Sequence, residues 1–382
     1  MDGFVHEALP VRIVFGAGAR RRVPEELARL GARRALLIAG GSQRAAADDI
    51  REALGASCAA TLTDVSEHVP RHAVTAAAER ARAVRADALV AIGGGSATGL
   101  AKAVAVDDQL PILALPTTYA GSEMTPIYGV TADGHKRIER SLAALPRTVV
   151  YDAELTAALP PAITAASGMN AIAHCVEGTW ARGATPLTDL LAEEAIRTLS
   201  EALPRAVAVP EDLDARESCL WGAALAGMVL AVAGTGLHHR LCHVLGGGFS
   251  LSHGGVHAAL LPHVVATNGP AHPRAFERLR SALDTDEPAG ALFDLAAELG
   301  APTSLGELGL RSDELPTVLE AASDAAAAND PPLQPAELLQ LLVGAREGRR
   351  PSPVATSVRS ATPTRRRPQA MPSPDIEREG VT

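Results

Sequence analysis

Histidines gather in one short stretch of the sequence, "HHRLCHVLGGGFSLSHGG", at residues 238–255. His239 and His243 are four residues apart, which puts both on one face of a helix, and His253 follows ten residues after His243. Neutral imidazole binds metal ions, and imidazole transfers protons near neutral pH. The stretch therefore allows three interpretations: a metal site, an acid–base site without a metal, or a helix that is merely rich in histidine.

A second polar pair with the same spacing, Asn170 and His174, lies in the apolar segment "GMNAIAHCVEG". A lone buried histidine is usually a hydrogen-bonded core residue. Several polar side chains that share one apolar cleft are costly to bury without a function. The two pairs together therefore favour a common functional site over two independent core histidines.

A glycine-rich turn in "DALVAIGGGSATGLAKAVAV" (87–106) follows a strand pattern and precedes a helix pattern. The turn allows close approach of a phosphate to the backbone through three glycines, Gly93, Gly94 and Gly95. We expect Ser96 to cap the helix, whose amino end attracts an anion, and we include Lys102 on that helix among the cofactor-binding candidates. The spacing matches neither the standard dinucleotide fingerprint nor a P-loop, and any tight turn can use glycines.

The next strand pattern ends in "LPTTYAGSEMTP" (115–126), which offers the hydroxyl groups of Thr117, Thr118 and Ser122. Ligands of open parallel sheets bind at the carboxyl ends of the strands. The alternative is that these hydroxyls only cap the following turn. The glycine turn and this loop follow neighbouring strands, so together they predict a nucleotide-binding site at the carboxyl edge of the sheet.

The elements that must position these residues divide the chain. Short β-type runs alternate with helical segments in the first part, at 11–15, 34–40, 88–94, 111–117 and 148–152. This alternation predicts a parallel sheet with crossover helices. Helical segments then follow almost without strands. We predict an α/β dinucleotide-binding domain at 1–159, an all-helical catalytic domain at 160–344, and a disordered Pro/Arg-rich tail at 345–382.

Composition narrows the functional class. The 382 residues carry a net charge of −9 and only 3% aromatic residues, which argues against nucleic acid as a partner. The four cysteines are scattered, and no signal peptide is evident, so we expect a cytoplasmic protein with reduced thiols. The longest apolar stretch (221–234) is short and interrupted by glycine, which predicts a buried core helix and no membrane association.

Four motifs occur in order: "GGGSATGLAKAVA", "LPTTYAGSEMTPIYGVT", "SGMNAIAHCVEG" and "GLHHRLCHVLGGGFSLSHGGVHAALLPHV". With them the chain resembles the iron-containing alcohol dehydrogenase superfamily, and more closely its maleylacetate reductase branch, over about residues 5–345. The resemblance implies a cleft between the two domains that holds NADH or NADPH, and a homodimer. It also implies that the glycine turn holds the pyrophosphate, while Thr117, Thr118 and Ser122 line the path towards the nicotinamide.

The resemblance also assigns the histidines. Metal-dependent members bind Fe²⁺ or Zn²⁺ with an Asp and three His, and the matching positions here are Asn170, His174, His239 and His253. His243 falls where those enzymes place a histidine near the nicotinamide. Asn170 is a neutral amide in place of a carboxylate that hard cations prefer, although three histidines can still hold Zn²⁺. Since the maleylacetate reductase pattern also has Asn there, we expect a metal to be dispensable and assign no metal ligand.

The implied activity is the NAD(P)H-dependent reduction of maleylacetate to 3-oxoadipate in the degradation of aromatic compounds. Hydride addition to a C=C bond conjugated with a ketone passes negative charge into an enolate, which hydrogen-bond donors can stabilise without a metal. We expect His243 to donate the proton and His239 and His253 to hold the enolate oxygen or a carboxylate. Candidates for binding the two substrate carboxylates are Lys136, Arg137, Arg140 and Arg240.

Three alternatives remain at this stage. The first is a metal-dependent alcohol dehydrogenase that uses His174, His239 and His253. The second is a lyase of the dehydroquinate synthase type, which shares the two-domain plan and uses NAD catalytically. The third is a homologue without activity that binds a nucleotide or a partner only, although neither the glycine turn nor the histidines show damage.

Overall fold

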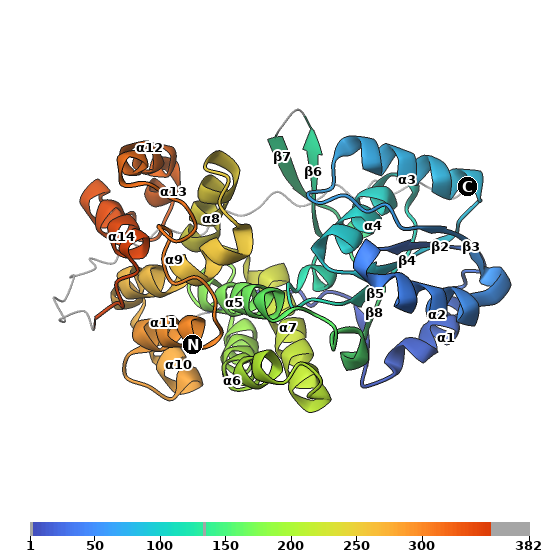
Figure 1. The fold of residues 1–382 in the computed structure, drawn as a ribbon, viewed down its shortest axis with the longest axis horizontal. Helices are drawn as coiled ribbons and strands as arrows, with labels where there is room; N and C mark the ends of the chain where they lie inside the picture. Colours follow the sequence, from blue (N-terminus) through green and yellow to red (C-terminus); the bar gives the residue numbers. More distant parts are fainter. Residues whose placement is uncertain (1–2, 133–134, 353–382) are drawn as a thin grey trace.

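A computed structural model describes residues 3–132 and 135–352, and the proposed tail beyond residue 352 lies outside the described residues (Figure 1). The strands are β1 (Arg12–Phe15), β2 (Ala35–Ala39), β3 (Cys58–Leu62), β4 (Ala88–Gly93), β5 (Ile112–Pro116), β6 (Ile127–Ala132), β7 (His135–Arg140) and β8 (Thr148–Tyr151). The helices before residue 160 are α1 (Val23–Arg29), α2 (Arg44–Leu54), α3 (Arg71–Ala83) and α4 (Gly95–Asp108). The longer part of the chain after them is helical.

Its helices are α5 (Pro161–Gly178), α6 (Pro186–Ala208), α7 (Leu213–Ala233), α8 (Leu237–Gly248), α9 (His253–Asn268), α10 (Pro273–Leu283), α11 (Pro288–Glu298), α12 (Leu315–Ala321), α13 (Ser323–Ala327) and α14 (Pro335–Glu347). Short 3-10 helices are η1 (Ala19–Arg22), η2 (Gly41–Gln43), η3 (Gly55–Ser57), η4 (Ser122–Met124), η5 (Leu142–Ala144), η6 (Ala153–Leu155), η7 (Gly269–Ala271) and η8 (Ser312–Glu314). The predicted fold class, an α/β domain followed by a helical one, is confirmed. Helix α14 continues past Gly344, where we expected the tail to begin.

A six-stranded parallel sheet in the order β1-β8-β5-β4-β2-β3 forms the centre of the first half. Because successive side chains of a strand point to opposite faces, β4 contributes to two cores. Ala88, Val90 and Ile92 pack with α1 and α2, whereas Leu89 and Ala91 pack with α3 and α4. The sheet is therefore covered on both faces, as its nearly continuous apolar strands predict.

The predicted strands are present with ends that differ by at most one residue, but three further strands were not predicted. Strand β3 has the small, half-buried sequence "CAATL" at the edge of the sheet, which carries little β-type signal. Strands β6 and β7 form a separate antiparallel hairpin, and β7 is the polar segment "HKRIER". Its charged residues give no β-type pattern, because the hairpin is not part of the buried main sheet.

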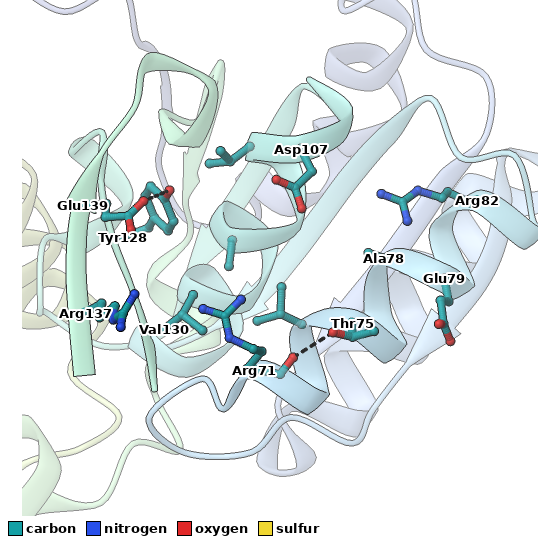
Figure 2. A pocket seen from close by; sticks show the side chains of 13 residues that line it. Arg71, Thr75, Ala78, Glu79, Arg82, Asp107, Tyr128, Val130, Arg137 and Glu139 are labelled. Carbon is teal, nitrogen blue, oxygen red and sulfur yellow. Dashed lines mark hydrogen bonds between the residues drawn. The ribbon is translucent and has the colours of Figure 1, made fainter. Parts of the chain in front are cut away.

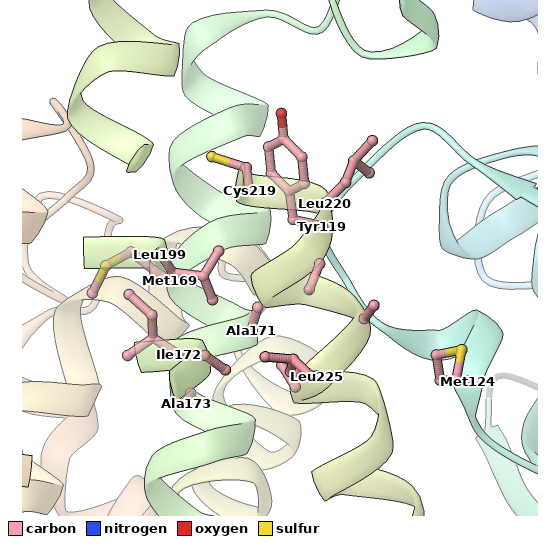
Figure 3. Close-up of a cluster of buried hydrophobic side chains, with 14 of the residues drawn as sticks. Tyr119, Met124, Met169, Ala171, Ile172, Ala173, Leu199, Cys219, Leu220 and Leu225 are labelled. Carbon is pink, nitrogen blue, oxygen red and sulfur yellow. The ribbon is translucent and has the colours of Figure 1, made fainter. Parts of the chain in front are cut away.

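The helical half begins at Pro161, where a proline at the first turn favours a helix start. Helix α7 is long and apolar enough to span a membrane by length and composition, and 67% of its most apolar window is buried inside the protein. It begins earlier than the apolar stretch at 221–234 suggested. Figure 3 shows α5 and α7 side chains around Met169 and Leu220 beside Tyr119, which belongs to the loop after β5. The apolar character of α7 is thus explained by burial in this core.

Two glycines bring the loop after β5 into direct backbone contact with α7. A Cβ atom on Gly227 would lie only 2.5 Å from the carbonyl oxygen of Gly121 and 2.8 Å from Cβ of Met124. A Cβ atom on Gly121, whose φ is +74°, would lie 3.0 Å from Cα of Gly227. No side chain fits between the two segments, so glycine is required on both sides of this contact.

A buried arginine joins the same loop to two helices, α5 and α7. Arg216 on α7 is fully buried and donates from Nη1 to the Tyr119 hydroxyl (3.0 Å) and to Thr164 Oγ1 (2.8 Å). It also donates to the carbonyl oxygens of Leu159 and Pro210, at 3.3 and 3.0 Å. The guanidinium therefore ties the end of the α/β half to the starts of α5 and α7.

An Arg216→Met variant is expected to lower the free energy of unfolding by about 3 kcal/mol or more, because it leaves buried acceptors without a donor. Denaturation by urea measures this loss. Arg205→Met is the matched control, since the ion pair of Arg205 with Asp212 is 63% exposed on the arginine side and is worth less than about 1 kcal/mol. Equal losses in the two variants would show that the buried arginine does not stabilise the junction.

Candidate active site

The glycine turn has the geometry of an anion-binding helix start. Gly93 ends β4 with φ +146°, a conformation that favours glycine, and α4 begins at Gly95. Gly94 is the N-cap residue and no side chain caps the helix, so the prediction that Ser96 is the cap was wrong. Ser96 lies within the first turn instead. Nothing lies within 4 Å of the Cβ position of the exposed Gly95, so the amino end of α4 is open to a phosphate group.

The loop after β5 lies against this turn. The backbone N–H of Thr117 donates to the carbonyl oxygen of Gly93, at 3.2 Å. A Cβ atom on Gly94 would lie 2.9 Å from Cγ2 and 3.2 Å from Oγ1 of Thr118. The structure thus brings the predicted cofactor residues of both loops together, and Gly94 leaves the room that Thr118 occupies. These features fit the pyrophosphate of a dinucleotide.

Lys102 does not present a free amine to the nucleotide edge. It binds the loop that follows β5 instead. Its Nζ donates to Thr125 Oγ1 (3.0 Å), to the carbonyl oxygen of Ile127 (2.9 Å), and to both oxygens of Ser122. Burial lowers the pKa of Lys102 to about 7, against the opposing effect of the Glu123 carboxylate. Lys102 therefore holds the segment that carries Ser122, and its buried amine is turned into the protein.

The same loop reaches the histidines. His174, on α5, contacts the backbone of Ala120 in a hydrogen bond and stacks on His239 of α8, with ring centroids 4.5 Å apart. His239 in turn packs against His257 of α9 at 4.9 Å. The contacts from Gly94 through Thr118 to Ala120 connect the phosphate turn to the imidazoles. The predicted histidines therefore lie beside the predicted nucleotide edge.

Six imidazoles form what we call the histidine cluster: His174, His238, His239, His243, His253 and His257. His243 and His253 are exposed and stack on each other with ring centroids 6.0 Å apart. The other four are buried. Within the cluster, the two exposed rings are the ones that can exchange protons directly with water.

Glu177 organises the buried part of the cluster, and the sequence analysis missed it. Its carboxylate is fully buried on α5 and accepts hydrogen bonds from the backbone N–H groups of Gly236, His238 and His239. It thereby satisfies the free donors at the amino end of α8. Its Oε2 also lies 2.6 Å from His239 Nδ1, so the Nδ1 hydrogen is directed to Glu177 and Nε2 faces the site.

Burial alone would raise the pKa of Glu177, but the hydrogen bond and electrostatic interaction with His239, together with the backbone N–H of Gly236, lower it to about 2. The carboxylate is therefore ionised at neutral pH. A signal for this residue was present in the sequence, because Glu177 follows His174 by three residues on the same apolar helix. Its spacing of three differs from the spacing of four that defines the histidine and amide pairs.

His238 and His257 were also missed as site residues, although each repeats the spacing used for the others. His238 precedes Cys242 by four residues on α8, and His257 follows His253 by four residues on α9. Nε2 of His238 lies 2.8 Å from Nδ1 of His257, and Nε2 of His257 lies 3.2 Å from Nε2 of His253. A chain of imidazoles therefore links the buried interior to the exposed His253.

The buried imidazoles make stability depend on pH. Burial lowers the pKa of His238 to about 3, and it holds the pKa of His174 and His257 well below 6.5. Unfolded histidines titrate near 6.5, so between these values the unfolded chain binds more protons than the folded one. The free energy of unfolding is then expected to be greatest above pH 6.5 and to fall by about 1.4 kcal/mol per pH unit for each such histidine below it.

Urea denaturation at a series of pH values between 5 and 8 measures this slope. His238→Gln should remove the share of His238 from it, because glutamine does not titrate. An unchanged slope in that variant would contradict neutral burial of His238.

The metal-ligand positions of metal-dependent relatives are not arranged here for a divalent cation. Asn170 Oδ1, His174 Nδ1 and His239 Nε2 are buried without a hydrogen-bond partner. However, Nε2 of His253 is turned to His257, and Asn170 supplies no charge. Among the described residues, His174, His239 and His253 do not bring their ligand atoms within 4.8 Å of one another. This donor set does not fit the metal.

A cavity of about 310 Å³ lies apart from the histidine cluster, between α3, α4 and the β6–β7 hairpin (Figure 2). Arg71 and Arg137 face it, together with Glu139, which accepts a hydrogen bond from the Tyr128 hydroxyl at 2.6 Å. Arg137, a candidate for substrate carboxylates, lines this cavity instead. Arg140 donates to the carbonyl oxygen of Ala231, and Arg240 is exposed on α8.

Comparisons with known proteins agree with the arrangement. Residues 10–153 match the model of the iron-containing alcohol dehydrogenases, and residues 164–343 match that of the C-terminal part of the same family. The chain is 45% identical over 345 residues to a maleylacetate reductase of Sphingobium indicum, which covers 90% of this chain and 98% of the relative.

Solved structures give the same result. The crystal structure of a maleylacetate reductase from a Rhizobium species superposes with a TM-score of 0.89 at 42% identity, over 92% of this chain and 100% of that one. A sulfoacetaldehyde reductase of Bifidobacterium kashiwanohense in complex with NAD⁺ superposes with a TM-score of 0.83 at 27% identity, over 89% and 98% of the two chains. The chain thus belongs to the iron-containing alcohol dehydrogenase family, in its maleylacetate reductase branch.

Proposed function

We propose that this chain reduces maleylacetate to 3-oxoadipate with NADH or NADPH. As a member of its family it is an oxidoreductase that uses a nicotinamide cofactor. The observation that carries the proposal is its 45% identity, over 90% of its length, with a maleylacetate reductase. The position of the histidine cluster beside the glycine turn supports it. A cofactor bound at the turn and a substrate bound at the histidines would then lie next to each other, as hydride transfer requires.

The bound cofactor supplies the hydride, and the remaining chemistry belongs to the chain. The amino end of α4 would hold negative charge on the cofactor, and the loop with Thr117 and Thr118, which contacts His174 through Ala120, would position it. Hydride addition to the conjugated double bond of the substrate creates an enolate. The new charge requires hydrogen-bond donors at the enolate oxygen, and a proton must reach carbon.

The geometry suggests how the imidazoles divide these tasks. His239 donates its Nδ1–H to Glu177, so Nε2 faces the substrate, and Nε2 donates to a substrate oxygen when the ring carries a second proton there. His243 and His253 are exposed and stacked, and each can reload a proton from water. We assign the proton transfer to His243, which lies one helical turn after His239, and binding of the enolate oxygen or a carboxylate to His239 and His253.

We also propose that the reaction needs no metal. The neutral Asn170 and the contact between His253 and His257 support this, because they remove a charge and a lone pair from the donor set of the metal-dependent relatives. A conjugated ketone flanked by carboxylates needs less activation than an isolated carbonyl, so hydrogen-bond donors suffice.

The test is the oxidation of NADH and of NADPH in the presence of freshly prepared maleylacetate, measured by absorbance with and without EDTA. We expect steady consumption of the nicotinamide that EDTA does not change, with 3-oxoadipate as the product. Loss of activity with EDTA, restored by Fe²⁺ or Zn²⁺, would favour a metal-dependent reductase. Absence of turnover with maleylacetate would contradict the proposed substrate.

A homodimer and a cytoplasmic location stay predictions. Light scattering of the purified chain measures its mass in solution, and a mass of one chain would contradict the dimer. Fractionation of the producing cells locates the protein.

A further inference from the structure

A second set of metal-binding atoms lies behind the histidine cluster. His238 and Cys242 are one turn apart on α8, and His257 faces them from α9. All three residues are buried. Their ligand atoms, two imidazole nitrogens and one sulfur, lie within 4.8 Å of one another. This is the one such group of histidine, cysteine and carboxylate donors in the part of the chain that the structure describes.

The distances within this group suit a small cation that prefers nitrogen and sulfur. Sγ of Cys242 lies 3.6 Å from Nε2 of His238 and 3.6 Å from Nδ1 of His257. A tetrahedral Zn²⁺ site, with bonds of about 2.0 Å to nitrogen and 2.3 Å to sulfur, separates nitrogen from sulfur by about 3.5 Å. The two nitrogens are 2.8 Å apart and share a hydrogen, whereas ligands would be about 3.3 Å apart. The rings therefore need to separate by about half an ångström.

The hydrogens can be placed so that both imidazoles present a lone pair. His257 then carries its hydrogen on Nε2 and donates it to Nε2 of His253, which lies 3.2 Å away. His238 carries its hydrogen on Nδ1, and the Cys242 thiol releases its proton to solvent. His257 thus has the second hydrogen bond that commonly fixes the ring of a metal-bound histidine, whereas Nδ1 of His238 is buried without a partner.

Charge balance also favours a cation at this position. Glu177 is a buried carboxylate that accepts the backbone N–H of His238 at 2.6 Å and acts electrostatically on both His238 and Cys242. A divalent cation with one thiolate leaves one positive charge, which Glu177 offsets. The exposed His253, in contact with His257, places the site one imidazole away from solvent.

We propose that His238, Cys242 and His257 form a binding site for Zn²⁺ or a similar thiophilic divalent cation. The three side chains supply one sulfur and two nitrogens, and the fourth position takes a solvent-derived ligand. The site differs from the position that metal-dependent relatives use, since it shares none of Asn170, His174, His239 and His253. Of these two sites only the proposed one contains sulfur, so a metal–thiolate signal identifies it.

Titration of the untagged full-length chain with Co²⁺, after removal of metals by chelation, tests the proposal. Co²⁺ replaces Zn²⁺ in such sites, and a bound thiolate gives a charge-transfer absorption that oxygen and nitrogen ligands do not. We expect one equivalent of Co²⁺ to produce this band and Zn²⁺ to abolish it. The Cys242→Ser variant should lose the band and bind Co²⁺ about 100-fold more weakly or worse, because loss of an outer partner alone costs about 10–100-fold.

Cys175→Ser is the matched control, since Cys175 is also a buried helical cysteine and lies outside the group. It should keep the band. If Cys242→Ser does not fold by circular dichroism, His257→Gln provides the second variant, and it should weaken Co²⁺ binding while the thiol is retained. No binding, a band that survives in Cys242→Ser, or binding without a band that His174→Gln abolishes would each overturn the proposal. The readout is optical, so it does not depend on the proposed activity.

Discussion

A His243→Gln variant is expected to reduce maleylacetate about 10²–10⁴-fold more slowly than the parent chain, with little change in the KM for NADH. Glutamine can donate a hydrogen bond but cannot give up a proton at neutral pH. His243 is an exposed residue of α8, whereas the cofactor pyrophosphate is expected at the amino end of α4, so cofactor binding should remain. Steady-state kinetics with both substrates varied separates kcat from the two KM values.

His72→Gln serves as the control, because His72 is an exposed histidine on α3. Its kcat is expected to stay within about twofold of the parent value, as for most surface substitutions. If His243→Gln kept nearly full turnover, the proton would have to come from another group. His253, stacked on His243, would then be the next residue to replace.

Glu177→Gln is expected to lower kcat/KM about 10–100-fold and the free energy of unfolding at pH 7 by about 3 kcal/mol. An amide cannot accept the four hydrogen bonds that reach Glu177 from the amino end of α8 and from His239. His239 then loses the partner that sets which of its nitrogens faces the substrate. Kinetics and urea denaturation measure the two effects.

The pH dependence distinguishes this role from simple packing. The pKa of Glu177 is about 2 in the folded protein against an ordinary value of 4.5. Its contribution to stability is therefore complete above pH 4.5 and is lost as the pH falls towards 2. The difference in unfolding free energy between parent and Glu177→Gln should shrink over that range, and a constant difference would contradict the ionised carboxylate.

Glu26→Gln is the control for loss of a buried carboxylate elsewhere. Glu26 is also fully buried, on α1, and pairs with Arg12 at 2.7 Å and with Arg22 at 3.5 Å. Its replacement should destabilise the chain but leave kcat/KM within about twofold. Equal losses of activity in both variants would show that the effect of Glu177 is general destabilisation.

Local patterns in the sequence predicted the parts of the site that depend on neighbours along the chain. Gly93 marks a strand-to-helix turn because few other residues adopt its φ of +146°, Gly94 leaves room for Thr118, and the structure confirms the turn. Spacing of four residues on apolar helices placed Asn170 with His174 and His239 with His243. The histidines converge as predicted because α5, α8 and α9 pack together in the helical half.

Contacts between distant segments could not be predicted in the same way. Glu177 is separated by about sixty residues from the α8 backbone that it binds, so its role depends on how α5 packs. Lys102 has the type and position of a phosphate-binding residue, but its amine is drawn inward by the carbonyl groups of the loop around Ser122. Strand β3 forms because it pairs with β2, and its own small residues give little indication of a strand.

The bare contact between Gly121 and Gly227 has a consequence for exchanging parts between relatives. Gly121 belongs to the first half of the polypeptide and Gly227 to the second. A Cβ atom on either one would collide with the backbone of the other. A chimera that joins the first half of one relative to the second half of another will assemble only when both parents carry glycine at this seam. A chimera with its crossover between residues 153 and 164 therefore needs glycine at position 121 from one parent and at position 227 from the other.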